Sequence, residues 1–109
     1  MLYVYELEVL KNIEEIIKKS KESIYLAVLY GSVARRDHKP DSDIDLMVVA
    51  DKDKIQELED EFSKLYLKYF IPISVKFYTP TQFSQVKDRP FILKALNEGR
   101  TIWERKKIG

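Results

Sequence analysis

The 109-residue sequence contains no cysteine and has no long uncharged run. The absence of cysteine excludes disulfide bonds, thiolate metal sites and a cysteine nucleophile, and it is consistent with a reducing, cytoplasmic setting. The longest uncharged run, residues 23–34, is shorter than the ~20 residues that a transmembrane helix needs. Glu6 and Glu8 stand where a secretory signal would need an apolar run. We therefore expect a cytoplasmic protein with no membrane-spanning segment.

The sequence also lacks an excess of either charge. Lysine and arginine number 19, aspartate and glutamate 18, and the formal net charge is +1. A general nucleic-acid binder needs a basic excess to neutralise phosphates, so the balance argues against that class. At 45% hydrophobic residues the chain is richer in apolar side chains than disordered segments are, and it contains no repeat or linker. We expect residues 1–109 to fold as a single domain.

Hydrophobic spacing predicts alternating helices and strands. Apolar residues three or four positions apart indicate amphipathic helices, continuous apolar runs indicate buried strands, and period-two alternation indicates a half-exposed strand. About a dozen residues join the first two strands, which favours an antiparallel or mixed sheet. The expected fold is α+β, a small mixed sheet of three to four strands flanked by helices. The expected elements are helix 3–19, strand 24–30, helical turn 32–36, strand 44–50, helix 52–70, strand 71–78, short helices or turns starting at 79 and 90, and edge strand 101–103.

Gly31 and Ser32 lie where the first strand gives way to the helical turn. A glycine at this point lets a ligand approach the backbone, while amide donors and the Ser32 hydroxyl point at it, which suits a phosphate group. Taken alone, the pair is more typical of an ordinary turn with Ser32 as the helix N-cap. Arg35 and Arg36 follow in the same loop, where they either clamp a triphosphate or balance nearby aspartates in solvent.

Asp43 and Asp45 stand two residues apart at the start of the second strand, so both side chains project from the same face. Neighbouring carboxylates repel each other unless a cation lies between them, and Mg²⁺ bound by one or two carboxylates and substrate phosphates is a common solution. A calcium loop starting at Asp41 is excluded, because it would need glycine at Leu46 and glutamate at Lys52. A structural alternative, in which Asp43 and Asp45 pair with the loop arginines, stays open.

Gly-Ser, ten intervening residues and Asp-x-Asp at the start of an apolar strand together resemble the signature of the polymerase-β nucleotidyltransferase superfamily. The length and the order of elements are most similar to its minimal nucleotidyltransferase (MNT) proteins. The resemblance implies that Gly31 and Ser32 hold nucleotide phosphates and that Asp43 and Asp45 are the catalytic residues that bind Mg²⁺, with Mn²⁺ as an alternative. It further implies transfer of a nucleoside monophosphate from a nucleoside triphosphate, with ATP expected, to a hydroxyl acceptor.

The resemblance also implies a protein partner. Family members this small often accompany a HEPN-type toxin as its antitoxin and can adenylylate it, so a HEPN-type protein is the expected acceptor. No feature of the sequence indicates a nucleic-acid partner, and self-association stays open.

One position departs from the family pattern. The family places a third carboxylate on the strand that follows the long helix, where this sequence has Ser74, with Lys76 next on the same face. Lys76 is expected to neutralise Asp45 or to contact phosphate. Since the third carboxylate helps to activate the attacking hydroxyl, its absence should reduce the rate more than nucleotide binding. Three readings follow: a slow enzyme, an enzyme in which Asp51 or Glu57 substitutes, or a nucleotide-binding module that acts on its partner by contact.

Overall fold

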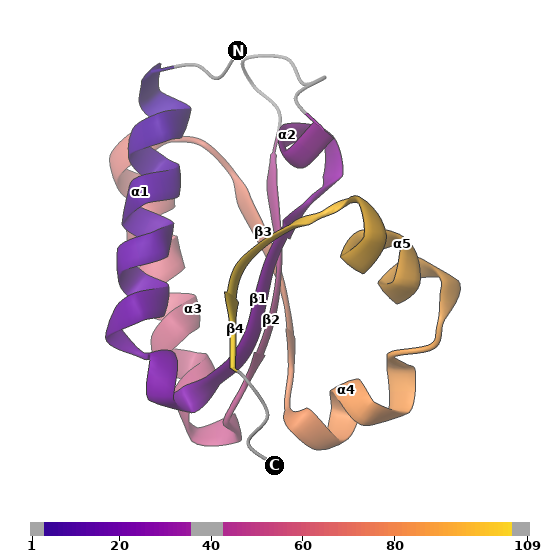
Figure 1. Cartoon of the computed structure of the whole chain (residues 1–109). Helices are drawn as coiled ribbons and strands as arrows, with labels where there is room; N and C mark the ends of the chain where they lie inside the picture. The colour runs from indigo at the N-terminus through magenta and orange to yellow at the C-terminus, as the bar shows by residue number, and fades with distance from the viewer. Residues whose placement is uncertain (1–3, 36–42, 106–109) are drawn as a thin grey trace.

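The computed structural model describes residues 4–35 and 43–105, and Figure 1 shows them as a sheet between two layers of helices. This arrangement confirms the predicted α+β fold. No helix within the described ranges is long and apolar enough to cross a membrane. The elements are α1 Val4–Lys19, the 3₁₀ turn η1 Lys21–Ser23, β1 Ile24–Tyr30, α2 Gly31–Arg35, β2 Ile44–Ala50, α3 Lys52–Tyr69, β3 Ile73–Tyr78, α4 Pro80–Val86, α5 Pro90–Glu98 and β4 Arg100–Glu104.

The four strands form one mixed sheet in the order β3-β2-β1-β4. Strand β1 is antiparallel to both of its neighbours, β2 and β4, whereas β3 is parallel to β2. The parallel pair requires a crossover, and the 18-residue helix α3 provides it. The mixed sheet predicted from the short connection between the first two strands is therefore confirmed, and β3 and β4 are its edges.

Helices α1 and α3 cover one face of the sheet, on the left of Figure 1. Their apolar stripes pack on alternate residues of β1 and β2, such as Ala27, Leu29 and Leu46, in one continuous core. Burial of this core is the main favourable contribution to folding, at about 25 cal/mol for each Å² of apolar surface removed from water. The buried residues of the core are Val9, Leu10, Ile13, Ile16, Ile17, Ile24, Ala27, Leu29, Val33, Ile44, Leu46, Val48, Ala50, Leu58, Phe62 and Leu65.

Helices α4 and α5 lie against the other face, on the right of Figure 1. Local signals define both helices: each starts with a proline in its first turn, and the Thr79 hydroxyl accepts a hydrogen bond from the Gln82 amide in a capping box. Among the described residues, a small apolar cluster packs this layer against the sheet. Its buried residues are Val28, Met47, Ile92 and Ala95.

Strand β4 is fixed to the body of the sheet by the one tryptophan of the chain. The Trp103 indole N–H donates a hydrogen bond to the Ile24 carbonyl at 2.9 Å, and the ring packs against the main core. A backbone hydrogen bond from Arg105 to the Tyr25 carbonyl continues the pairing beyond the strand.

Candidate active site

The end of β1 and the start of β2 meet at one end of the sheet, beside helix α2 (Figure 1). Tyr30 is paired with Asp45 in the antiparallel register, and Asp45 is next to Ser74 in the parallel register with β3. Alternation along β2 places Asp45 on the face of Met47, which belongs to the cluster under α4 and α5. Asp43, two residues earlier, is exposed, whereas Asp45 is half-buried. The structure thus brings the Gly-Ser and Asp-x-Asp segments together.

Gly31 touches the Asp45 carboxylate. A Cβ atom built on Gly31 would collide with Oδ2 of Asp45 and lie 3.2 Å from its Cγ. Gly31 also has a φ of +77°, in the left-handed region that side chains disfavour. From the sequence, this glycine is expected to let a ligand approach the backbone. The structure adds a second reason, because any side chain at Gly31 would displace the carboxylate beside it.

Tyr30 lies between Asp45 and helix α5. Burial, together with the negative charge of Asp45 and the neighbouring Tyr78, raises the pKa of Tyr30 to about 12. The Tyr30 ring meets Phe91 of α5 edge to face, with 5.7 Å between the ring centroids. The Lys76 ammonium lies over the Phe91 ring, 5.3 Å from its centroid. Phe91 of α5 therefore contacts both Tyr30 of β1 and Lys76 of β3.

A pocket of about 210 Å³ opens beside Gly31, between the end of β1 and helix α5. Sequence reasoning missed this pocket, because its walls come from residues sixty positions apart. The available signal was the helix period: Phe91, Lys94 and Glu98 share one face of α5, which adjoins the face that is buried against the sheet. The lining residues are Tyr30, Gly31, Phe91, Lys94, Ala95 and Glu98.

The proposed substitutes for the missing third carboxylate are not at this site. Asp51 lies at the opposite end of β2, where it precedes α3 and accepts a hydrogen bond from the Tyr25 hydroxyl at 2.8 Å. Glu57 is exposed on α3, in an ion pair with Lys54. Of the three alternatives, the one in which Asp51 or Glu57 completes the site is therefore excluded. Among the described residues, no group of three or more histidine, cysteine, aspartate or glutamate side chains is arranged to hold a metal ion.

The carboxylates of Asp43 and Asp45, two residues apart in the sequence, fit one kind of magnesium site. Mg²⁺ is commonly bound by one or two carboxylates, with water and substrate phosphates as its other ligands. Asp43 and Asp45 supply such a donor set only together with a phosphorylated substrate. Arg36 and the side chains of Ser32 and Arg35, which the sequence assigned to nucleotide binding, lie outside the described part of the structure.

A model of the family "Polymerase beta, Nucleotidyltransferase" matches residues 11–108. The chain belongs to this nucleotidyltransferase family. A relative in Methanocaldococcus jannaschii, named as a protein adenylyltransferase (MJ0604), is 32% identical over 97 residues, which span 85% of this chain and 96% of the relative. The family and this relative place the chain among the nucleotidyltransferase enzymes.

Solved structures support the fold assignment. A toxin–antitoxin structure with AMP-PNP superimposes with a TM-score of 0.58 at 19% identity, covering 88% of this chain and 73% of the matched chain. A Sulfolobus solfataricus protein described as a nucleotidyltransferase gives a TM-score of 0.54 at 20% identity, covering 93% and 85% of the two chains. At these identities the likeness concerns the fold alone, and it agrees with the predicted polymerase-β-like architecture.

Proposed function

We propose that the chain binds a magnesium–nucleoside triphosphate, with ATP as the expected nucleotide, and transfers its nucleoside monophosphate to a hydroxyl group. The observation that carries the proposal is the register that sets Gly31 against the Asp45 carboxylate. It joins the two halves of the family signature at one end of the sheet. The proposed site consists of Gly31, Ser32, Arg35 and Arg36 for the nucleotide, and of the two aspartates for the metal and catalysis.

Asp43 and Asp45 are the proposed ligands of Mg²⁺, with Mn²⁺ as an alternative. When bound, the ion supplies positive charge that offsets the charge developing on the phosphate oxygens. The exposed Asp43 is accessible from solvent, whereas Asp45 is held in place by Gly31 on one side and by its pairing with Tyr30. The two carboxylates therefore have different tasks, since Asp45 is positioned by the fold and Asp43 is open to the substrate.

The pocket beside Gly31 is the proposed place for the nucleoside. Its volume of about 210 Å³ suits a base with part of its ribose, and it adjoins the aspartates through a shared residue. Phe91 offers an aromatic surface for a base, and Lys94 and Glu98, one helical turn apart, offer a donor and an acceptor. A nucleotide bound in this way extends from α5 to Asp43 along the face of the sheet.

The proposed reaction is a displacement at the α-phosphorus. The acceptor oxygen forms a bond to phosphorus, the bond from phosphorus to the oxygen that bridges to the β-phosphate breaks, and pyrophosphate leaves with that electron pair. The acceptor proton passes to water, because Ser74, next to Asp45 in the register, is not a base. This arrangement predicts slow transfer compared with family members that carry a third carboxylate.

The acceptor is proposed to be a hydroxyl group of a protein of the HEPN type. The M. jannaschii relative is named as a protein adenylyltransferase, and one structure of similar fold is a toxin–antitoxin structure with AMP-PNP. Residues 1–109 are proposed to act as one catalytic domain that relies on the partner to present its hydroxyl group.

Mass spectrometry tests this function. The purified protein is incubated with ATP, Mg²⁺ and a candidate HEPN-type partner, and the partner should gain the mass of one or more nucleoside monophosphates. Asp43→Asn should abolish the gain, since it removes one of only two proposed metal ligands. Asp53→Asn, which makes the same change at an exposed position on α3, is the matched control and should leave the gain unchanged. No gain with either Mg²⁺ or Mn²⁺ would contradict the transfer reaction.

The exposed Ser74 beside Asp45 favours a second candidate function, a module that neutralises its partner by contact. In that case Asp43→Asn leaves partner binding and neutralisation intact, and calorimetry detects little binding of Mg²⁺–ATP. Ser74→Asp separates the two candidates further, because it restores a carboxylate at the position that the family uses. A rate increase of about tenfold in Ser74→Asp would identify a slow enzyme, whereas transfer that appears only in this variant would identify a chain that acts by contact.

A further inference from the structure

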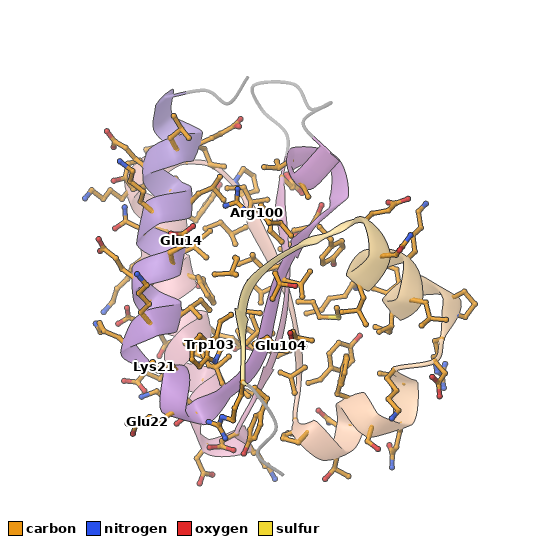
Figure 2. All side chains as sticks on the ribbon, in the orientation of Figure 1. Glu14, Lys21, Glu22, Arg100, Trp103 and Glu104 are labelled. Carbon is orange, nitrogen blue, oxygen red and sulfur yellow. The ribbon has the colours of Figure 1, made fainter. Side chains whose placement is uncertain are left out.

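A second cavity lies on the opposite side of the sheet from Asp45, between helix α1 and edge strand β4. Its volume is about 580 Å³. Figure 2 shows Glu14 and Arg100 facing each other across this space, with Lys21 and Trp103 further along it. The α1–β4 groove is defined by its lining residues Glu14, Ile17, Lys18, Lys21, Arg100, Thr101, Ile102 and Trp103.

The floor of the groove is apolar and held in place. Ile17 is almost fully buried, and the half-buried Ile102 and Trp103 pack against the main core. The hydrogen bond from the Trp103 indole to the Ile24 carbonyl fixes the ring orientation. A ligand that covers these side chains removes apolar surface from water without having to order the floor first.

The rim of the groove is positively charged. Lys18, Lys21 and Arg100 are exposed cations, and Glu14 is the one acidic residue in the lining. Arg100 forms an ion pair with Glu14 at 3.5 Å, which links β4 to α1. One acid against three bases leaves an excess of positive charge along the groove. Charge complementarity therefore favours an occupant that carries carboxylates beside apolar groups.

The groove runs along β4, whose outer edge pairs with no other strand of the described ranges. Strand β4 is the last strand of the sheet on this side, and its pairing with β1 shifts register between Ala27 and Val28, where Ile102 is the extra residue. An edge strand can pair with an added extended segment, but a bulge limits such pairing to a short stretch. Recognition in this groove therefore depends on side chains more than on backbone pairing.

We propose that the α1–β4 groove binds an extended acidic segment of a partner protein. Apolar side chains of the segment cover Ile102 and Trp103, and its carboxylates lie near the lysines and Arg100 of the rim. A nucleic acid fits less well, because phosphate-driven binding rests on many cations and this groove offers three. A partner held here leaves the Asp45 face of the sheet accessible, so the inference does not depend on the transfer reaction.

Trp103 provides the test, since it is the one tryptophan of the chain and lies in the groove. A terminally blocked peptide of alternating glutamate and leucine is titrated into the full-length protein, and tryptophan emission should shift and saturate. The matching glutamine–leucine and lysine–leucine peptides should bind at least about tenfold more weakly, because they lack the carboxylates. An oligonucleotide of deoxythymidine that binds as tightly as the acidic peptide would overturn the proposal in favour of a general polyanion site.

Charge variants locate the binding. The double variant Lys18→Gln with Lys21→Gln should weaken binding of the glutamate–leucine peptide about tenfold, since it removes two cations of the rim. The matched control, Lys52→Gln with Lys64→Gln, makes the same change of net charge at exposed positions of α3 and should leave binding unchanged. Equal effects of the two double variants, or no change in Trp103 emission in the unaltered protein, would overturn the proposal.

Discussion

The two faces of the sheet differ in how deeply they are packed. In the described part of the chain, sixteen buried residues form one core under α1 and α3, whereas four buried residues form a small cluster under α4 and α5. The aspartates and the pocket of the proposed active site belong to the thinly packed face. The face under α1 and α3, called the deep face, fixes the strands and their register. The face under α4 and α5, called the thin face, leaves Asp45 half-buried, where the proposed substrate can reach it. The main core and the proposed active site thus lie on opposite sides of the same strand, β2.

Neighbouring residues of β2 provide the largest expected effect. Leu46 and Met47 are both fully buried, but Leu46 lies in the large core and Met47 in the small cluster. Leu46→Ala should lower the free energy of unfolding by about 4 kcal/mol, because the surrounding core cannot collapse around the cavity. Met47→Ala should lower it by about 2 kcal/mol, because α4 and α5 can shift toward the sheet. Urea unfolding measures both free energies, and the slopes of the two transitions should be compared. Equal losses of unfolding free energy in the two variants would contradict the difference between the faces.

Gly31→Ala, on the thin face, should reduce the transfer rate much more than the free energy of unfolding. The added methyl group collides with the Asp45 carboxylate and forces a left-handed backbone on alanine. The conformational penalty is about 1–2 kcal/mol in unfolding free energy. Displacement of a proposed metal ligand should reduce the transfer rate at least about a hundredfold, since even partners of ligands affect metal sites by ten- to a hundredfold. Steady-state rates measured below the unfolding transition test this, and a loss of only a few-fold would remove Asp45 from the proposed site.

Phe91→Ala should weaken nucleotide binding through the pocket. A base stacked on an aromatic side chain gains about 1–3 kcal/mol, so the KM for ATP should rise about tenfold while kcat changes little. Leu93→Ala is the matched control, because Leu93 is exposed on the same helix and does not line the pocket. If both variants change KM equally, the effect comes from the stability of α5 and the pocket does not hold the base.

The elements of this fold could be predicted from sequence because their signals are local. Pro90 starts α5, Gly99 follows its end, and the apolar period of α3 ends within one residue of the predicted boundary. The mixed sheet could be predicted from the short connection between the first two strands. The order of the strands did not follow from sequence, because it depends on pairings between residues far apart, such as Val28 with Thr101.

The candidate site was predictable only where its residues are close in sequence. The spacing of Asp43 and Asp45 predicted a shared face, and the family resemblance drew attention to Ser74. Asp51 was one alternative for the third carboxylate, and it fails because six residues of strand at about 3.3 Å each place it roughly 20 Å from Asp45, at the other end of β2. The helix period could place Phe91 on one face of its helix, but nothing in the sequence indicates that α5 folds back against the end of β1.

The smallest expected effect concerns Tyr30, which is paired with Asp45 and contacts Phe91 of α5 on the thin face. The pKa of its hydroxyl is raised from 10.0 to about 12, first by burial and then by the charge of Asp45. Because the folded chain holds this proton more tightly than the unfolded chain, the stabilisation is complete below pH 10 and is lost as the pH rises toward about 12. Tyr30→Phe should therefore show a shallower loss of stability over that interval, measured by urea unfolding with a chelator present. Tyr66→Phe, an exposed tyrosine of α3, should keep the slope of the unaltered protein, and the same slope in both variants would mean that folding does not raise the pKa of the Tyr30 hydroxyl.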